Sequence, residues 1–349
     1  IWSRVLQLRI LFITRDLPYP LNNGGKIRVY SLIRQLSERH EVDLVALDRE
    51  PESPERIAAI GEVCGQVTAV PLTPRQRPDA KRREQMLSII RRRPYAHTAH
   101  YSPEMQAAID RQLAENHYDI VQVEYAQMGY YDLGSHPGRI LDQHNVEAEI
   151  MDRAAQRESW SLRKLFYWRE AAKFRQEEVE ICRRFGHCLA TSARDRDLLA
   201  AEVPTSQFHV VPNGVDCAHF DAAGPRADPP QDTLLFTGSL AYYPNVDGLH
   251  FFMREVFPQI CAAVPTVRFL IAGREPPPAI TAYAAHPNVE VVADVPDMRD
   301  YYAKATVVVV PLRVGGGTRL KILEAMAMAK PVVSTAVGAE GIDVTPGID

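Results

Sequence analysis

The 349-residue sequence lacks the features that define several large classes of protein. It has no run of eighteen apolar residues, so no segment is long enough to cross a bilayer as a helix. Its five cysteines are scattered and form no Cys-x-x-Cys pair. This pattern excludes a disulfide scaffold and a zinc site and favours the reducing cytoplasm. The net charge of -4 gives no overall case for binding nucleic acid.

Two further absences narrow the interpretation. A Gly-x-Gly-x-x-Gly dinucleotide fingerprint does not occur. The chain starts with Ile1 rather than Met, and the apolar run from Leu8 to Ile13 fits a strand better than a signal peptide. Apolar residues make up 46% of the chain and charged residues 24%, which allows a sizeable core and argues against disorder.

Short β-branched runs alternate with longer helical patterns along the chain. The runs are continuously apolar, as in parallel strands that are covered on both faces. The strand candidates are Arg9–Thr14, Val42–Leu47, Val67–Pro71, Ile120–Glu124, Arg139–Asp142, Cys188–Thr191, His209–Val211, Leu234–Gly238, Arg268–Gly273, Val289–Val292, Thr306–Pro311 and Pro331–Thr335. Strands that alternate with helices predict an α/β protein built from βαβ units.

A segment without periodicity divides the chain. The residues "DAAGPRADPPQD", from Asp221 to Asp232, are rich in Pro, Ala and Asp and are expected to form a linker. The sequence therefore predicts two doubly wound, Rossmann-like domains, residues 1–220 and 221–349. Two such sheets are expected to place a ligand cleft between them, lined by the strand ends at each switch point.

The segment from Pro311 to Thr335 combines a glycine-rich loop with the start of a helix. The glycines are Gly315, Gly316 and Gly317. A loop of glycines lets the backbone approach a ligand closely. Thr318 is expected to cap the following helix, which is expected to run to about Ala329.

Two cations, Arg319 and Lys321, are then expected in the first helical turn, where each opposes the helix dipole at a cost of about 0.3–1 kcal/mol. The conflict disappears if an anion binds at the helix start, because free amides, dipole and cations then converge on it. Glu324 lies roughly 9 Å further along the axis than Thr318. A carboxylate there suits sugar hydroxyls beside a diphosphate. The alternative is a tight turn with solvated cations and a half-exposed Glu324.

Several segments together resemble one family. They are "LPYPLNNGGKIRVYSLIRQL", "LDQHNVEAE", "VVPNGVD", "LLFTGSLAYYPNVDGLHFF", "RFLIAGREPP", "VPDMRDYYAKATVVVVPL" and "GGGTRLKILEAMAMAKPVVST". The ensemble resembles the retaining GT-B glycosyltransferases of family 4, and more closely the bacterial sugar transferases associated with exopolysaccharide export. The resemblance implies a hexosyltransferase-type enzyme that moves a sugar from a nucleotide-sugar donor to a glycan or lipid-linked acceptor, with no metal and no further cofactor. It assigns the acceptor to the first domain and the donor to the second.

The resemblance also assigns roles around the donor diphosphate. The loop with Gly24 and Gly25 closes over the diphosphate in relatives, although a plain turn is the alternative. Many relatives have Arg directly after Gly238, where this chain has Ser239. We therefore expect Arg319 and Lys321 to replace the missing cations.

A second departure concerns the donor sugar. Many relatives have two glutamates with seven residues between them, and the first would fall at Gly316. The second matches Glu324. Contacts to the donor sugar that depend on the first glutamate therefore do not carry over.

Further site residues follow strand ends. His144 matches a cleft histidine close to the donor sugar and acceptor, and Glu124 ends a neighbouring strand candidate. Arg274 is expected to flank the nucleotide, and Val295 lies where relatives pack the base. Asp195 and Asp197 could instead indicate a metal site, but acids after a Ser cap fit a first helical turn better.

Two basic stretches interleave cations with apolar residues. Residues 75–93 carry Arg75, Arg77, Lys81, Arg82, Arg83, Arg91, Arg92 and Arg93. The stretch from Trp160 to Arg175 alternates Trp, Leu and Phe with Arg and Lys. Such a mixture can sit on an anionic membrane surface. The alternative is two solvated helix faces whose aromatic side belongs to the core.

Three expectations complete the sequence hypothesis. The nearest rival enzyme is a nucleotide-sugar epimerase, and the rival of another class is a non-catalytic nucleotide-sugar-binding subunit. The turn at Asn213 and Gly214 is expected only to lead the chain toward the linker. Relatives continue past the position of Asp349 with further helices, so the second domain is expected to be truncated.

Overall fold

The computed structural model describes residues 6–49, 54–72, 81–221, 232–345 and 347–348. These residues form two compact units, and the chain passes from one to the other between Pro212 and Asn213. The division falls a few residues before the expected boundary at 220 and 221. Most of the expected linker lies outside the described residues.

Unit 1 is built on a seven-stranded sheet in the order β3-β2-β1-β4-β5-β6-β7, and all its neighbouring strands are parallel. The strands are β1 (Arg9–Thr14), β2 (Glu41–Asp48), β3 (Val67–Pro71), β4 (Ile120–Glu124), β5 (Arg139–Gln143), β6 (His187–Ala190) and β7 (Gln207–Val210). The apolar runs predicted each of them to within two residues. The strand order reverses between β1 and β4, which is the switch point of this unit.

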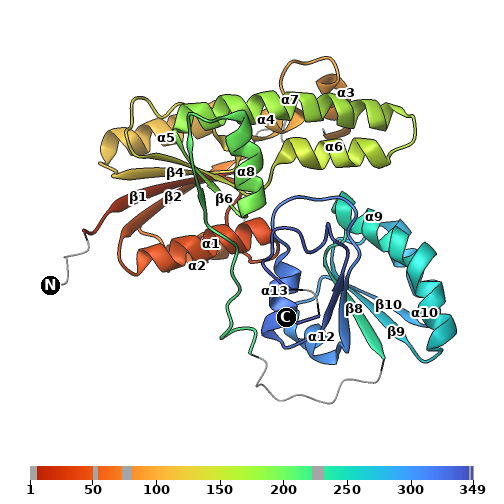
Figure 1. Ribbon diagram of the computed structural model, residues 1–349. Helices are drawn as coiled ribbons and strands as arrows, with labels where there is room; N and C mark the ends of the chain where they lie inside the picture. The colour runs from red at the N-terminus through yellow and green to blue at the C-terminus, as the bar shows by residue number, and fades with distance from the viewer. Residues whose placement is uncertain (1–5, 50–53, 73–80, 222–231, 346, 349) are drawn as a thin grey trace. The chain divides into compact units, whose positions relative to one another are not determined.

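Alternate side chains of β1 explain why this strand is apolar at every position. Leu11 and Ile13 point into one core cluster, and Ile10 and Phe12 point into another on the opposite face. The first cluster is completed by α5 (Pro103–Glu115) and α7 (Leu162–Phe185), and the second by α1 (Gly24–Ser37) and α2 (Pro54–Gly61). Figure 1 shows these helices on the two faces of the sheet. Helices on both faces confirm the doubly wound class.

The remaining helices of unit 1 lie around this framework. They are α3 (Lys81–Ser88), α4 (Tyr95–His100), α6 (Glu147–Arg157), α8 (Ala193–Glu202) and the 3₁₀ turn η3 (Ala126–Met128). Ser192 caps α8 by accepting a hydrogen bond from the backbone N–H of Asp195 at 3.0 Å. The interpretation of this segment as a capped helix start is therefore confirmed.

Unit 2 contains a five-stranded parallel sheet in the order β10-β9-β8-β11-β12. Its strands are β8 (Thr233–Ser239), β9 (Arg268–Arg274), β10 (Val289–Ala293), β11 (Val307–Val310) and β12 (Val332–Ser334). Its helices are α9 (Tyr243–Phe251), the π-helical turn η4 (Phe252–Val256), α10 (Phe257–Ala263), α11 (Pro278–Thr281), the 3₁₀ turn η5 (Ala282–Ala285), α12 (Arg299–Lys304) and α13 (Leu320–Ala327). The switch point lies between β8 and β11.

The start of α13 differs from the sequence prediction. Arg319 is the N-cap residue, and no side chain caps the helix. Thr318 was therefore wrongly predicted as the cap: its hydroxyl accepts a hydrogen bond from Asn213 Nδ2 at 2.6 Å. Asn213 is consequently part of this loop and does more than lead the chain toward a linker. The helix ends at Ala327, before Ala329, whose φ of 49° leaves the helical region.

No helix within the described ranges is both long enough and apolar enough to span a membrane.

Candidate active-site elements in the two units

The switch point of unit 2 is shaped by Arg319. Its guanidinium turns back onto the glycine loop, where Nη1 donates to the carbonyl oxygens of Gly316 and Gly317. Nη2 lies 3.4 Å from the carbonyl oxygen of Val337, and the residue is only 9% exposed. Arg319 therefore holds the loop in one shape as well as bringing a positive charge to the helix start.

The adjacent glycines are required by these cations. Gly238 and Gly315 both have positive φ, at 142° and 145°. A Cβ atom on Gly238 would lie 3.0 Å from Lys321 Nζ, and one on Gly315 would lie 2.7 Å from the guanidinium of Arg319. Other residue types would thus be strained at both positions and would displace the cations.

Lys321 lies in the first turn of α13, with its Nζ beside Gly238. Its Nζ donates to Asn245 Oδ1 at 3.2 Å and stands 4.1 Å from the ring centroid of Phe236. Burial and, to a lesser extent, the neighbouring charge of Arg319 lower the pKa of Lys321 to about 7, although Glu324 opposes the shift. The charge of one cation therefore acts directly on the other, as expected where an anion binds.

Glu324 has a partner that the sequence did not predict. The hydroxyl of Tyr302 donates to Glu324 Oε2 at 2.7 Å, and the hydroxyl of Thr237 lies 3.1 Å from the same phenol oxygen. Burial raises the pKa of Glu324, whereas Tyr302 and Lys321 act in the opposite direction. The carboxylate is therefore oriented by Tyr302 and lies in the field of Lys321.

The other predicted residues of unit 2 lie at neighbouring strand ends. Ser239 ends β8, and its carbonyl oxygen accepts a hydrogen bond from Asn245 Nδ2 at 2.7 Å. Arg274 ends β9 with Nη2 at 3.4 Å from Glu275 Oε1. Val295 follows β10 and packs against the core cluster of unit 2. Asn245 links Ser239 to Lys321, because it donates to the Ser239 carbonyl oxygen and accepts from Lys321 Nζ.

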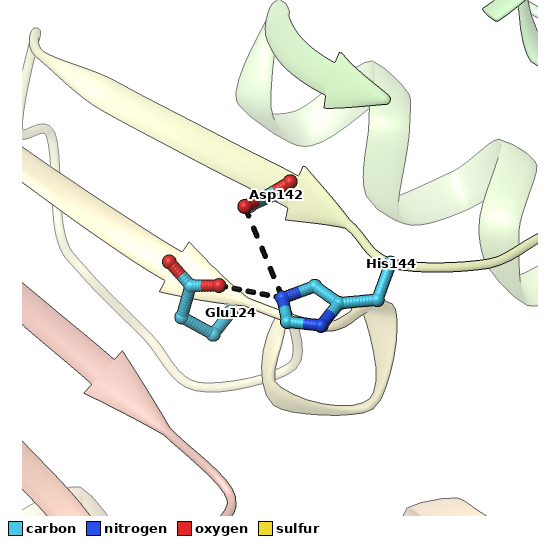
Figure 2. Close-up of side chains that lie close together, drawn as sticks. All are labelled: Glu124, Asp142 and His144. Carbon is cyan, nitrogen blue, oxygen red and sulfur yellow. Dashed lines mark hydrogen bonds and ion pairs between the residues drawn. The ribbon is translucent and has the colours of Figure 1, made fainter. Parts of the chain in front are cut away.

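At the carboxyl ends of β4 and β5, unit 1 brings together His144, Glu124 and Asp142 (Figure 2). His144 Nε2 lies 2.7 Å from Glu124 Oε2 and 3.8 Å from Asp142 Oδ2. The side chains of both acids are fully buried, and that of His144 is 6% exposed. The sequence singled out His144 and Glu124, and the structure places them in direct contact.

Arg28 and Gln122 donate hydrogen bonds to these two carboxylates. Arg28 of α1 binds Asp142 through Nε at 2.8 Å and Nη2 at 3.0 Å, and Gln122 Nε2 donates to Glu124 Oε1 at 2.7 Å. The three ligand-type side chains converge within 4.8 Å. A buried guanidinium in the same group supplies the positive charge that a metal ion would otherwise bring. The cluster therefore joins two acids, an imidazole and a guanidinium in one buried polar network.

Tyr125 covers the cluster in a strained conformation. Its φ of 72° is rare for a residue with a side chain. Its ring lies 3.8 Å from the ring of His144 and 3.8 Å from the guanidinium carbon of Arg15. The predicted loop glycine Gly25 makes room for this tyrosine, because a Cβ atom there would lie 1.9 Å from the Tyr125 hydroxyl oxygen.

Gly24 has a simpler position. It is the first residue of α1, directly after the N-cap Asn23, whose side chain accepts a hydrogen bond from the backbone N–H of Lys26 at 3.0 Å. The glycine pair therefore begins a helix at the carboxyl end of β1, beside the switch point of unit 1.

The sequence did not single out Asp142, Arg28 or Tyr302 as site residues. Asp142 ends a predicted strand, so its place beside Glu124 follows from strand pairing. Arg28 and Tyr302 lie in ordinary helical segments, and Arg28 meets Asp142 across 114 positions of the chain. Only the folded structure reveals such a contact.

Two doubly wound, parallel-sheet units are the architecture of the GT-B glycosyltransferases. Residues 22–219 match the family described as Glycosyltransferase Family 4, and residues 231–347 match Glycosyl transferases group 1. The first match covers more than half of the chain, and the chain belongs to glycosyltransferase family 4.

Similar proteins are found both by sequence and by fold. An uncharacterized 44.6 kDa protein in the cps region of Klebsiella pneumoniae is 24% identical, over 97% of this chain and 86% of its own length. HepE from Anabaena, solved with UDP and glucose, has a TM-score of 0.60 at 13% identity, over 94% of this chain and 80% of its own. WaaG, a glycosyltransferase involved in lipopolysaccharide biosynthesis, has a TM-score of 0.58 at 14% identity, over 94% and 81%.

Proposed function

We propose that this glycosyltransferase moves a sugar, with retention of anomeric configuration, from a nucleotide-diphosphate sugar to a glycan or lipid-linked acceptor in bacterial surface polysaccharide synthesis. The observation that carries the proposal is the loop of unit 2, where Arg319, Lys321 and the start of α13 gather positive charge at a switch point. UDP and UDP-glucose in the HepE structures and the cps-region relative support it.

In this proposal the main chemical task is to stabilise charge that develops on the leaving diphosphate. The amides of Gly316, Gly317 and Thr318, with Arg319 and Lys321, serve that purpose. Because the cations belong to the chain, no metal and no cofactor besides the donor is required.

The other predicted residues take supporting roles. Glu324, oriented by Tyr302, accepts hydrogen bonds from ribose hydroxyls, and Arg274 and Val295 flank the nucleotide. His144 orients the sugar from unit 1, the acceptor-side unit. The acceptor hydroxyl attacks from the side of the leaving group, so no enzymic nucleophile is needed.

The test begins with displacement of a labelled nucleotide-sugar by a panel of free nucleoside diphosphates. The preferred donor is then incubated with and without an acceptor, and the products are analysed. Transfer that depends on the acceptor supports the proposal, and the anomeric configuration of the product tests retention. Conversion of the donor sugar without acceptor would identify an epimerase. Binding without transfer or hydrolysis would identify a non-catalytic subunit.

We further propose that unit 1 docks on an anionic membrane from its cytoplasmic side. Trp160, which precedes α7, and Leu162 and Trp168 of its first two turns are 89%, 79% and 60% exposed, contrary to the alternative in which they belong to the core. The neighbouring helix α3 and the residues after it expose Met86 and Ile90. Arginines and lysines lie among them in the sequence. Exposed Trp beside cations suits an anionic headgroup layer.

Vesicle sedimentation tests this docking surface. The protein should bind phosphatidylglycerol vesicles and not phosphatidylcholine vesicles, and Trp160→Ala with Trp168→Ala should weaken the binding. Leu198→Ala, which removes an exposed apolar side chain from α8, is the matched control. Equal binding by the double variant and the control would reject the surface. Arg75 and Arg77 of the first basic stretch lie outside the described residues.

A further inference from the structure

The hydrogen bond between Glu124 and His144 is unusually well shielded. The carboxyl is fully buried, the imidazole nearly so, and the two atoms lie 2.7 Å apart. Gln122 holds the other carboxylate oxygen, so Oε2 faces the ring. Figure 2 shows that Nε2 points toward both acids, while Nδ1 lies on the opposite side of the ring. Glu124 thus engages one ring nitrogen and leaves the other to a different environment.

The proton count of the pair determines what Nδ1 can do. With one proton on the pair, Nε2–H donates to the Glu124 carboxylate, and Nδ1 is an acceptor. When the second proton enters the bond between Glu124 and His144, Nδ1 carries a hydrogen and becomes a donor, whether the proton in that bond resides on oxygen or on Nε2. A single protonation event therefore reverses the hydrogen-bonding role of the ring.

The surroundings favour such a titration near neutral pH. Arg28 faces the pair through its bidentate contact with Asp142. Asp142 also hydrogen-bonds Glu124, and burial together with the charge of Glu124 raises the pKa of Asp142. Gln122 and Tyr125 are neutral neighbours, and Arg15 lies across the Tyr125 ring. Burial raises the pKa of Glu124 to about 7 and lowers that of His144 to about 3. The second proton of the pair therefore binds to the Glu124 carboxylate in preference to His144.

We infer that Glu124 is a positioning residue for His144: it holds Nε2, and the protonation of the Glu124–His144 pair sets whether Nδ1 donates or accepts. The tautomeric part stands without any assumption about activity. The catalytic consequence rests on the proposed function, in which Nδ1 would meet an oxygen of the sugar. A donating Nδ1 binds an ether or phosphate oxygen, and an accepting Nδ1 orients a hydroxyl.

The direct test is nitrogen NMR of the protein labelled with ¹⁵N-histidine, between pH 5.5 and 8.5. The His144 signal is assigned by its loss in His144→Gln. In the unsubstituted protein we expect Nδ1 to change from protonated to unprotonated as the pH rises through neutrality. An Nδ1 that stays in one state throughout would overturn the inference, and this result needs no variant of Glu124.

Glu124→Gln then tests the source of the effect. The amide oxygen of Gln can still accept from Nε2–H, but the side chain cannot take up the proton. His144 should therefore remain the neutral Nε2–H tautomer across the whole range. Glu177→Gln is the matched control, since Glu177 is a buried acid of α7 whose pKa burial raises to about 8. An unchanged His144 titration in Glu124→Gln would reject Glu124 as the group that controls it.

Activity provides a separate readout. In Glu124→Gln, kcat should lose its pH dependence near neutrality while KM for the donor changes less than threefold. Transfer that keeps its pH profile in this variant overturns the catalytic part. A protein that shows the tautomer switch but transfers no sugar from any donor overturns the proposed function and leaves the positioning role supported.

Discussion

The two switch points occupy equivalent positions in their sheets but have opposite electrostatic character. In unit 1, Arg28 is paired with Asp142, and the remaining acid Glu124 contacts an uncharged His144. In unit 2, the cations Arg319 and Lys321 lie near Glu324, whose carboxylate accepts a hydrogen bond from the neutral phenol of Tyr302. The fold thus determines where a ligand can bind, and the side chains decide which chemistry each place performs.

The two sites also differ in how much of the chain they need. Arg319 bonds carbonyl oxygens two and three residues before it, so its loop is nearly self-contained. Arg28 reaches Asp142 across 114 positions and depends on correct packing of α1 against the sheet. We therefore expect substitutions in unit 1 to affect stability and those in unit 2 to affect ligand binding.

The largest effect is expected for Arg28→Ala. It leaves the buried Asp142 carboxylate without its cation, which should lower the free energy of unfolding of unit 1 by about 3–5 kcal/mol. Denaturant unfolding followed by tryptophan fluorescence measures it. Arg175→Ala breaks the exposed pair with Asp152 and should cost less than about 1 kcal/mol. Equal losses in the two variants would contradict the contrast drawn here.

Next come the cations of unit 2. Arg319→Ala and Lys321→Ala should each weaken nucleotide-sugar binding by about ten- to hundredfold, because a charged hydrogen bond contributes roughly 1.5–3 kcal/mol. Calorimetry with the preferred donor measures the change. Arg268→Ala removes an exposed arginine at the amino end of β9 and should bind normally. Parental affinity in both site variants would show that these cations do not hold the diphosphate.

Lys321 should also make donor binding depend on pH. Burial lowers its pKa to about 7 in the free protein, so above this pH an anionic ligand must bring in a proton. Affinity should fall by up to about tenfold per pH unit above neutrality. A nucleotide-sugar is the suitable probe, since it lacks the terminal phosphate that titrates near pH 6. Lys321→Arg keeps its charge, so its affinity for the donor should not change with pH in this range. The same slope in both proteins would show that a group other than Lys321 causes the pH dependence.

The lowered pKa of Lys321 also makes the stability of the free protein depend on pH, with the opposite sign. The unfolded chain keeps Lys321 protonated up to about 10.4, while the folded state loses this proton near 7. The unfolded state therefore binds more protons between these values, and the Lys321 contribution to stability rises with pH there. It is least favourable below neutrality, where the folded protein must bury the charge. Lys321→Met should reduce this part of the pH dependence of stability.

The smallest effect is expected for Glu324→Gln. The substitution keeps the shape and the acceptor for Tyr302 but removes the charge, so donor affinity should fall about fivefold, near 1 kcal/mol. The melting temperature should barely change. Tyr302→Phe removes the orienting phenol and leaves the carboxylate, and should have a similarly small effect on affinity. A large drop in melting temperature with unchanged affinity would identify Glu324 as a structural residue.

The sequence predicted the parts of this molecule that depend on local patterns. Apolar runs such as Arg9–Thr14 and Val67–Pro71 are strands with the predicted bounds, because parallel strands covered on both faces are apolar throughout. The Ser192 cap followed from residue type alone. The cation loop was recognisable because its glycines and cations are adjacent in the chain.

Contacts between distant residues could not be predicted. Thr318 has the residue type of a helix cap, but its hydroxyl accepts a hydrogen bond from Asn213, which lies 105 positions earlier in the chain. The helix begins at Leu320, later than predicted. Tyr302 and Arg28 belong to helices whose sequences give no sign of a buried polar partner. Such contacts depend on how elements pack, which a single sequence does not encode in any short window.

The contact between Gly25 and Tyr125 has a consequence for sequence variation in relatives. With the phenol oxygen where a Cβ atom would stand, position 25 accepts no side chain while position 125 is Tyr. Gly25→Ala should therefore be better tolerated together with Tyr125→Phe, which removes the clashing oxygen and leaves the ring carbon 3.1 Å from the new Cβ atom. Across related chains the two positions should change as a pair, so that alanine or serine at the first accompanies loss of the hydroxyl at the second.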